Sequence, residues 1–141
     1  MKTWSTWPCR VPMRWPAHST CSPQAHPLAL TLGAEGAWLL HRNGAQCFAK
    51  EAHPLQVVDT VGAGDSFLAG LLAHLLRQAQ AAGGTSFVRF VETLTADACQ
   101  QALRHALASA SLCVMEQGCV PPGWEAALVW SQQNPAAQDP R

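Results

Sequence analysis

The segment from Asp59 to Phe67, DTVGAGDSF, combines residue types that suit phosphoryl transfer. Gly62 and Gly64 are separated only by an alanine, so no large side chain blocks a ligand from the backbone. The first amides of a following helix have no intrahelical partner and lie at the positive end of the helix dipole, which makes such a turn an anion site. Asp65 lies at the edge of this site, where a carboxylate can accept the proton of a hydroxyl group that receives a phosphate.

The alternative interpretation is an ordinary glycine-rich turn in which Asp65 only caps the helix. Acidic residues on both sides of the glycines, and the apolar run that resumes at Phe67, favour the chemical interpretation. No lysine follows the glycines as in a GxxxxGK[ST] nucleotide loop, and the GxGxxG pattern of dinucleotide-binding turns is also missing. The pattern therefore predicts an anion site of another kind.

Such a turn must be positioned by a strand before it and a helix after it. The apolar run 55–58 predicts the strand, and the apolar run 67–76 predicts the helix. A second long helix is predicted over 96–117, because apolar or small residues recur every three to four positions. A loop and a short helix are expected between the two, over 83–94. The signals for the two ends of the second helix are Thr95, Asp97 and Gly118.

The segment before the turn predicts a β-meander. The run 28–32 has the length and composition of a strand, and 33–36 is a turn. The runs 37–40 and 46–49 flank Asn43-Gly44, which is the strongest short hairpin signal. Without the glycine turn, the segment 28–49 predicts only a meander. The helix over 96–117 by itself predicts only core packing.

The glycine segment closely resembles DTxGAGD, the C-terminal signature of the ribokinase-like (PfkB) family of carbohydrate kinases. The resemblance implies that Gly62, Ala63 and Gly64 form an anion hole for the transferred phosphoryl group. It also implies that Asp65 is the catalytic base and contacts the sugar hydroxyl. By the same resemblance, a monovalent cation, usually K⁺, is bound by a set of residues whose members here are Asp59, Val61, Cys113, Glu116 and Gly118.

Two other segments resemble the same family. The residues 31–36 are similar to its TLGxxG segment, which lies under the nucleotide. The helix over 96–117 and the following Gly-x-x-Pro turn are similar to the helix that packs near the adenine. Family members often carry Asn where this chain has Leu107. The resemblance implies that the ATP-binding residues are Thr31, Leu32, Gly33, Ala34, Glu35, Gly36, Gly64 and Leu107.

The resemblance implies the C-terminal part of a three-layer α/β/α fold, with a mixed, mostly parallel sheet, a β-meander and two long helices. The implied function is ATP-dependent phosphorylation of a sugar hydroxyl, with fructose as the first expectation and ribose or a nucleoside as the second. ATP, Mg²⁺ and K⁺ are the implied cofactors, and intact relatives are implied to form homodimers. Family members are longer, and their sugar-contacting half and NxxE motif for magnesium are not found here.

We therefore expect a truncated chain that is weakly active or inactive, and the alternative is a non-catalytic nucleotide-binding or interaction fragment. A misread frame that yields an unfolded product is a third possibility. Residues 1–27 are rich in Trp and Pro and are expected to be disordered or frame-altered, 28–130 to be a partial kinase domain, and 131–141 to be a frayed tail.

Composition is consistent with a cytoplasmic enzyme. The formal net charge is +0 and no apolar run has the length of a membrane span, so neither nucleic acid nor membrane is expected as a partner. The six cysteines form no CxxC pair and are expected to be reduced thiols. The group His18, Cys21 and His26 fits no zinc spacing. The other histidines are expected at strand ends and on helix surfaces, and they are His41, His53, His74 and His105.

Overall fold

The computed structural model describes residues 27–41, 44–83 and 86–136. The predictions for residues 1–26 lie outside these ranges. Three strands, β1 (Pro27–Thr31), β2 (Ala37–His41) and β3 (Gln46–Ala49), pair antiparallel in the order β1-β2-β3. A short 3₁₀ turn, η1 (Gly33–Glu35), connects β1 to β2. The predicted β-meander is therefore confirmed. The described strands pair only antiparallel, so the mostly parallel sheet stays a prediction.

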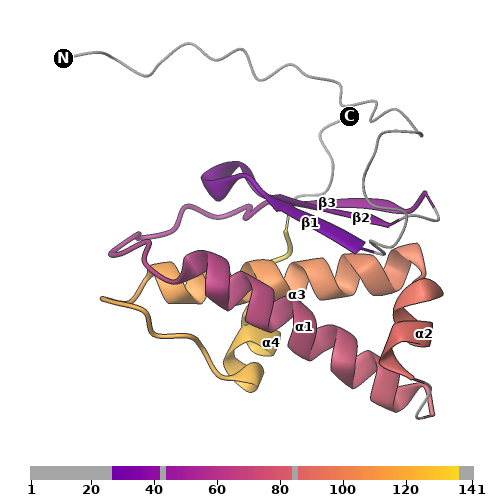
Figure 1. The fold of residues 1–141 in the computed structure, drawn as a ribbon. Coiled ribbons are helices and arrows are strands. Elements are labelled where there is room, and N and C mark those ends of the chain that lie inside the picture. Colours follow the sequence, from indigo (N-terminus) through magenta and orange to yellow (C-terminus); the bar gives the residue numbers. More distant parts are fainter. Residues whose placement is uncertain (1–26, 42–43, 84–85, 137–141) are drawn as a thin grey trace.

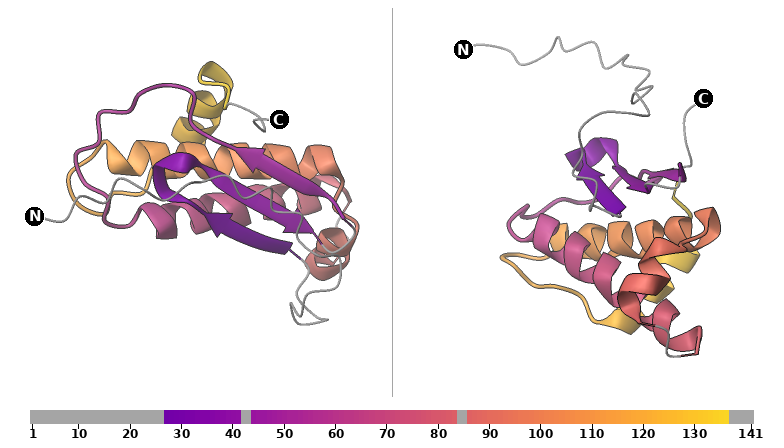
Figure 2. Two further views of the ribbon diagram at one scale, coloured as in Figure 1. Left: turned by 90° about the horizontal axis from the view of Figure 1, so that it is seen from above. Right: turned by 45° about the vertical axis from the view of Figure 1, so that its right-hand side comes forward.

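Four helices follow the sheet. They are α1 (Ala63–Ala81), α2 (Phe87–Glu92), α3 (Ala96–Val114) and α4 (Trp124–Gln133). The two long helices lie side by side beneath the sheet, and α4 packs against α3 (Figures 1 and 2). The short α2 connects the two long helices, as the sequence predicted. Among the described residues, no helix is both long and apolar enough to span a bilayer.

The core lies between the sheet and the two long helices. Phe67, Leu71 and Leu75 recur every four residues along α1 and are almost fully buried. They face Leu39 of β2 and Leu103 of α3 within one apolar cluster. Burying a large apolar side chain contributes about 1.5–3 kcal/mol, so this cluster is the main source of stability. The periodicity seen in the sequence therefore marks the buried faces of both helices.

The two long helices are in tight contact at a glycine. A Cβ atom on Gly70 of α1 would overlap the side chain of Ser109 on α3. The side chain of Thr95 caps α3 as predicted, because its hydroxyl accepts a hydrogen bond from the amide of Ala98 at 3.2 Å. The small residues predicted along the second helix thus permit tight packing of α3 against α1.

The strand predicted over 55–58 is wrong. Residues 51–60 form neither helix nor strand, and Val57 and Val58 are 56% and 54% exposed. A strand needs a neighbouring strand for its backbone hydrogen bonds, whereas here the amide of Val58 donates to the carbonyl of Val114 at 2.8 Å. We call residues 50–62, between β3 and α1, the connector.

Four helix ends differ from the predictions. The first long helix begins at Ala63 rather than at Phe67, and it runs to Ala81. The second ends at Val114, because the chain turns there and the amide of Gly118 donates to Asp59 instead of capping the helix. The last helix, α4, continues to Gln133, three residues into the segment predicted as a frayed tail.

The described cysteines are free thiols, as the sequence predicted. Cys47, Cys99 and Cys113 are buried and Cys119 is exposed. Burial raises the pKa of the Cys99 thiol to about 11, so this residue behaves as a small core side chain rather than a nucleophile.

Candidate functional site

The glycine turn is formed by the first residues of α1. Gly62 is the N-cap, with a left-handed φ of 79°, and its carbonyl accepts the first helical hydrogen bond from the amide of Ser66 at 2.8 Å. The amide of Ala63 donates to the carbonyl of Thr60 at 3.3 Å, closing the turn before the helix. Gly64 and Asp65 follow in the exposed first turn. This turn therefore presents helix-start amides and the positive dipole end to solvent.

Cys119 packs directly against the turn. A Cβ atom on Gly62 would overlap the Sγ atom of Cys119, which lies in the segment after α3. Glycine is therefore required at position 62 for two reasons, its positive φ and this contact. The sequence signal for the contact was absent, because the two residues are far apart along the chain.

Asp59 links the connector to the segment after α3. Its Oδ1 accepts a hydrogen bond from the amide of Val61 at 3.0 Å, and its Oδ2 accepts one from the amide of Gly118 at 3.0 Å. These backbone donors, that of Val61 first, lower the pKa of the Asp59 carboxyl below its ordinary value of 3.8. The amide of Asp59 itself donates to the carbonyl of Val114 at 3.2 Å. The carboxylate thus holds the start of α1 against the end of α3.

Four of the five residues predicted to bind a monovalent cation come together here. Besides the contacts of Asp59 with Val61 and Gly118, the Sγ atom of Cys113 lies 3.8 Å from the carbonyl oxygen of Val61. The side chain of Glu116 is exposed, and its amide donates to the carbonyl of Cys113 at 3.2 Å. Among the described residues, no group of three or more His, Cys, Asp or Glu side chains could hold a metal ion. An alkali cation here would rely on carbonyl oxygens together with one carboxylate.

The residues predicted to contact ATP form the end of β1 and the turn η1. The amide of Leu32 donates to the carbonyl of Gly36 at 2.8 Å, and Glu35 pairs with Lys50 at 2.9 Å. A Cβ atom on Gly36 would overlap the carbonyl oxygen of Ala49, so glycine lets this turn approach β3. Residues 31–35 are exposed.

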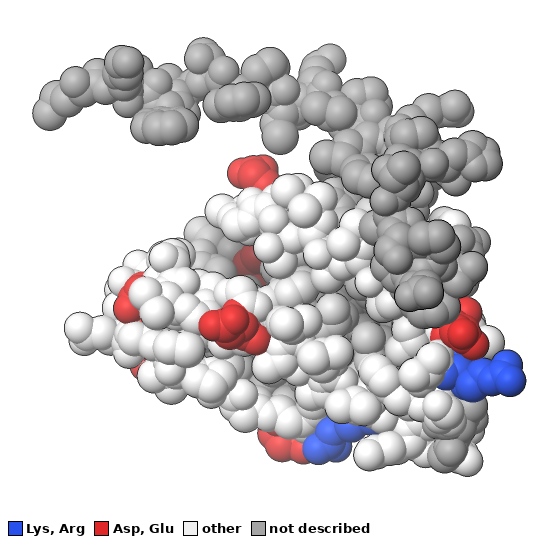
Figure 3. Space-filling view, in the orientation of Figure 1, with Lys and Arg blue, Asp and Glu red and all other residues white. Residues whose placement is uncertain are grey.

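These segments gather at one end of the molecule. The turn η1, the start of α1 and the end of α3 lie at the same end in both figures (Figures 1 and 2). Leu107 is separate from them, half-buried in the middle of α3. On the face drawn in Figure 3, several groups of acidic atoms lie toward this end, and others lie beside the lysine and arginine atoms at the right and along the lower edge.

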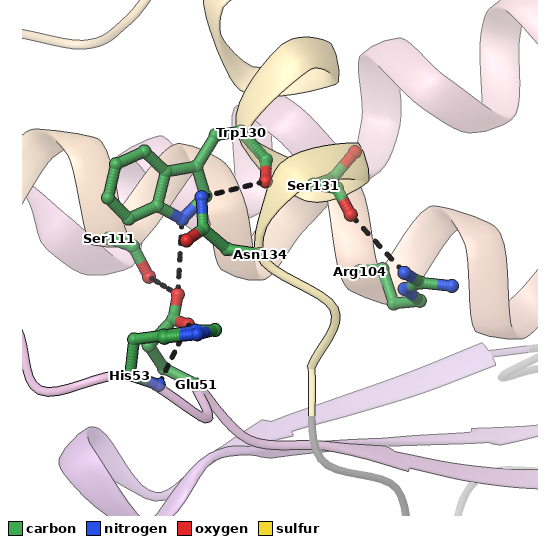
Figure 4. Close-up of polar contacts among 7 residues, drawn as sticks. All are labelled: Glu51, His53, Arg104, Ser111, Trp130, Ser131 and Asn134. Carbon is green, nitrogen blue, oxygen red and sulfur yellow. Dashed lines mark hydrogen bonds and ion pairs between the residues drawn. The ribbon is translucent and has the colours of Figure 1, made fainter.

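One polar centre has no signal in the local sequence, the carboxylate of Glu51 in the connector. Its Oε2 accepts hydrogen bonds from Ser111 Oγ of α3 at 3.0 Å and from Trp130 Nε1 of α4 at 3.2 Å (Figure 4). The partners are 60 and 79 positions away, so no local pattern could reveal them. Glu51 also lines a pocket between α3 and α4, whose other residues are Arg104, Leu107, Ala108, Trp130, Ser131, Asn134 and Ala136.

This chain is similar in sequence and fold to parts of known proteins. The uncharacterized sugar kinase YegV of Escherichia coli (strain K12) is 49% identical over 51 residues, which make up 36% of this chain and 15% of YegV. The Arabidopsis thaliana ribokinase complexed with ribose and ATP is 28% identical, with a TM-score of 0.53, over 75% of this chain and 29% of that protein. The phosphofructokinase-2 of Escherichia coli in complex with potassium has the same fold, with 17% identity and a TM-score of 0.53 over 77% of this chain and 29% of that protein.

The chain spans less than a third of the length of each of these proteins. Its own match to a family is more extensive, since the pfkB family carbohydrate kinases match residues 17–127. This match includes the β-meander, the glycine turn and both long helices. The chain belongs to the pfkB family of carbohydrate kinases.

Proposed function

We propose that this chain forms the nucleotide-binding part of an ATP-dependent sugar kinase. The observation that carries the proposal is the exposed glycine turn at the start of the 19-residue α1, with Asp65 in its first turn. A helix start binds phosphate through its amides and dipole, and an adjacent carboxylate can serve as a base. Membership of a carbohydrate kinase family supports the same chemistry.

In the proposed reaction, the hydroxyl oxygen of a sugar attacks the γ-phosphorus of ATP in line. A new O–P bond forms, the bond to the β–γ bridging oxygen breaks, and ADP leaves. Asp65 accepts the hydroxyl proton, while the turn formed by Gly62, Ala63 and Gly64 stabilises the charge on the transferred group. The products are a sugar phosphate and ADP.

Acidic residues lie near the end of the molecule that contains the glycine turn, so the proposal includes bound cations there. Phosphate would be held by backbone amides rather than by basic side chains, so a nearby cation would offset negative charge. The residues suited to K⁺ are Asp59 and the carbonyls of Val61, Cys113 and Gly118, with Glu116 alongside. The potassium in the phosphofructokinase-2 structure supports this assignment. Magnesium is proposed only as the ion that is bound to the phosphates of ATP.

The nucleotide would extend from the glycine turn along η1 and α3. The proposed contacts in and around η1 are Thr31, Leu32, Gly33, Ala34, Glu35 and Gly36. Leu107 would pack against the base, because its side chain cannot make the hydrogen bonds of an asparagine. The Arabidopsis ribokinase, which holds ribose and ATP, supports ATP as the donor. The proposed acceptors are fructose first and ribose or a nucleoside second.

A second candidate is a nucleotide-binding module that does not phosphorylate sugar. It is favoured by one observation: the chain corresponds to 29% of the ribokinase that binds both substrates. A carboxylate base accelerates the reaction much less when no hydroxyl group is held beside it. The free cysteines of both candidates fit the reducing cytoplasm.

Calorimetry and an activity assay separate these candidates. The purified chain is titrated with ATP, with fructose and with ribose, and ADP release is then measured with and without each sugar. Binding of ATP and sugar with sugar-dependent ADP release supports the kinase. Binding of ATP alone supports the second candidate, and no binding of ATP overturns both.

A further inference from the structure

The carboxylate of Glu51 connects three parts of the chain that are separate in sequence. It belongs to the connector, and it accepts hydrogen bonds from Ser111 of α3 and Trp130 of α4 (Figure 4). Its Oε1 also accepts a bond from the amide of His53 at 3.4 Å, within the connector. The Glu51 side chain is only 12% exposed, so these donors replace most of its contact with water.

The last helix, α4, is held differently at its two ends. Among its residues only Ala127 is fully buried. At its start, the ring of Trp124 lies 4.1 Å from that of His105 in α3. Toward its end, Arg104 Nη2 donates to the carbonyl of Ser131 at 3.2 Å. Figure 4 shows Glu51 below the Trp130 ring, where the hydrogen bonds from Ser111 and Trp130 meet. Hydrogen bonds therefore hold the C-terminal part of α4 against α3 and the connector.

The same helix forms one wall of the pocket that contains Leu107. Trp130, Ser131 and Asn134 line it from α4, while Leu107 and Ala108 line it from α3. Asn134 is itself held by a hydrogen bond from its Nδ2 to the carbonyl of Trp130 at 3.2 Å. A shift of α4 would change the width of this pocket beside Leu107.

The pocket itself has room for about one water molecule, so a base would lie across its mouth rather than inside it. We propose that Glu51 is a positioning residue that holds the end of α4 as one side of this mouth. This inference rests on the proposed function, because the ligand at Leu107 would be the base of ATP. Glu51 does not contact the glycine turn, so its effect is confined to the base and leaves phosphate binding unchanged. The Glu51 carboxylate thus affects how tightly the base of ATP binds, without taking part in phosphoryl transfer.

Two variants break the contact in different ways. Glu51→Ala removes the acceptor, and Trp130→Phe removes the indole donor while keeping a smaller aromatic ring in the pocket lining. The matched control is Glu125→Gln, which changes an exposed carboxylate in the first turn of α4. Each variant of the full chain is titrated with ATP and with inorganic tripolyphosphate, and hydrogen exchange is measured over residues 124–133.

Both test variants are expected to bind ATP roughly three- to tenfold more weakly, the effect of one lost hydrogen bond. Tripolyphosphate affinity should stay within about twofold of wild type, and exchange over α4 should become faster. The control should change none of these quantities. A merely structural role would weaken both ligands together, so that result overturns the proposal, as does wild-type ATP affinity in both variants.

The result also distinguishes this inference from the proposed function. A wild-type chain that binds neither ATP nor tripolyphosphate overturns the proposed function, and with it the role of Glu51 toward a nucleotide. Unchanged exchange over α4 in both variants overturns the contact as a positioning device even if ATP binds.

Discussion

The Oδ2 atom of Asp59 accepts a hydrogen bond from the amide of Gly118 at 3.0 Å, across 59 positions of sequence. Its other oxygen accepts from Val61, two residues on. One carboxylate therefore holds the chain before α1 against the turn after α3. The geometry of the glycine turn depends on this contact, since α1 begins only four residues after Asp59.

Asp59→Asn should lower the melting temperature at neutral pH, because an amide replaces an acceptor that serves two backbone donors. The folded pKa of Asp59 is depressed, so its stabilising contribution is complete above about pH 3.8 and is lost as pH falls through the folded pKa. The difference in melting temperature between wild type and variant should therefore become smaller as the pH is lowered. Thermal unfolding at pH 7 and at pH 3 measures this, and a difference independent of pH would contradict it.

Asp65→Asn should lower kcat for sugar-dependent ADP release by about 10²–10⁴, the range for a lost general base. ATP affinity should stay within about twofold, because the turn amides are unchanged. Asp97→Asn is the matched control, since it alters an exposed carboxylate in the first turn of α3. Near-normal turnover in the Asp65 variant would remove this residue from the proposed role.

Gly62→Ala should be strongly destabilising. The left-handed φ costs a non-glycine residue about 1–3 kcal/mol, and overlap with Cys119 adds to this cost. The double variant Gly62→Ala/Cys119→Ala should recover only the part that comes from overlap with the sulfur atom. Urea denaturation measures both. Full recovery of stability in the double variant would show that the positive φ at position 62 contributes nothing to the loss.

His105 should make the protein sensitive to moderate acid. It is 2% exposed and lies 4.1 Å from the ring of Trp124, and burial first, then the charges of His74 and Arg77, lowers its pKa to about 4. Between pH 6.5 and 4 the unfolded chain binds the proton that the folded protein excludes, so stability falls as pH falls, by about 3 kcal/mol at most.

The pH dependence of the unfolding free energy checks this prediction for His105. The groups facing the ring are His74 and Arg77 from α1 and Trp124 from α4, with Arg77 4.2 Å above the Trp124 ring. His105→Gln should flatten the profile between pH 6.5 and 4, whereas the exposed control His53→Gln should not. An unchanged slope in the His105 variant would assign the acid sensitivity to another group.

Local patterns in the sequence predicted most of the elements. The three-to-four residue spacing of Phe67, Leu71 and Leu75 identified α1, and Thr95 identified the start of α3. The Asn-Gly pair predicted the hairpin between β2 and β3. These signals are local because helix periodicity, capping and tight turns involve residues within a few positions of one another.

The elements that the sequence did not predict depend on distant partners. The run 55–58 is as apolar as a strand, yet it lies exposed, because a strand forms only beside another strand. His105 was expected on a helix surface, but α4 and Trp124 cover it. No local feature of the sequence distinguishes Glu51 from other charged loop residues. Only the fold brings Ser111 and Trp130 within hydrogen-bond distance of it.

The sequence by itself therefore determined the family, the glycine turn with Asp65, the meander and the two long helices. Only the tertiary structure decided which polar groups share a partner, where α3 stops, and which histidine is buried. The physical reason is the range of the interactions. Backbone propensity and periodicity act within one element, whereas burial and hydrogen bonding between elements exist only after the chain has folded.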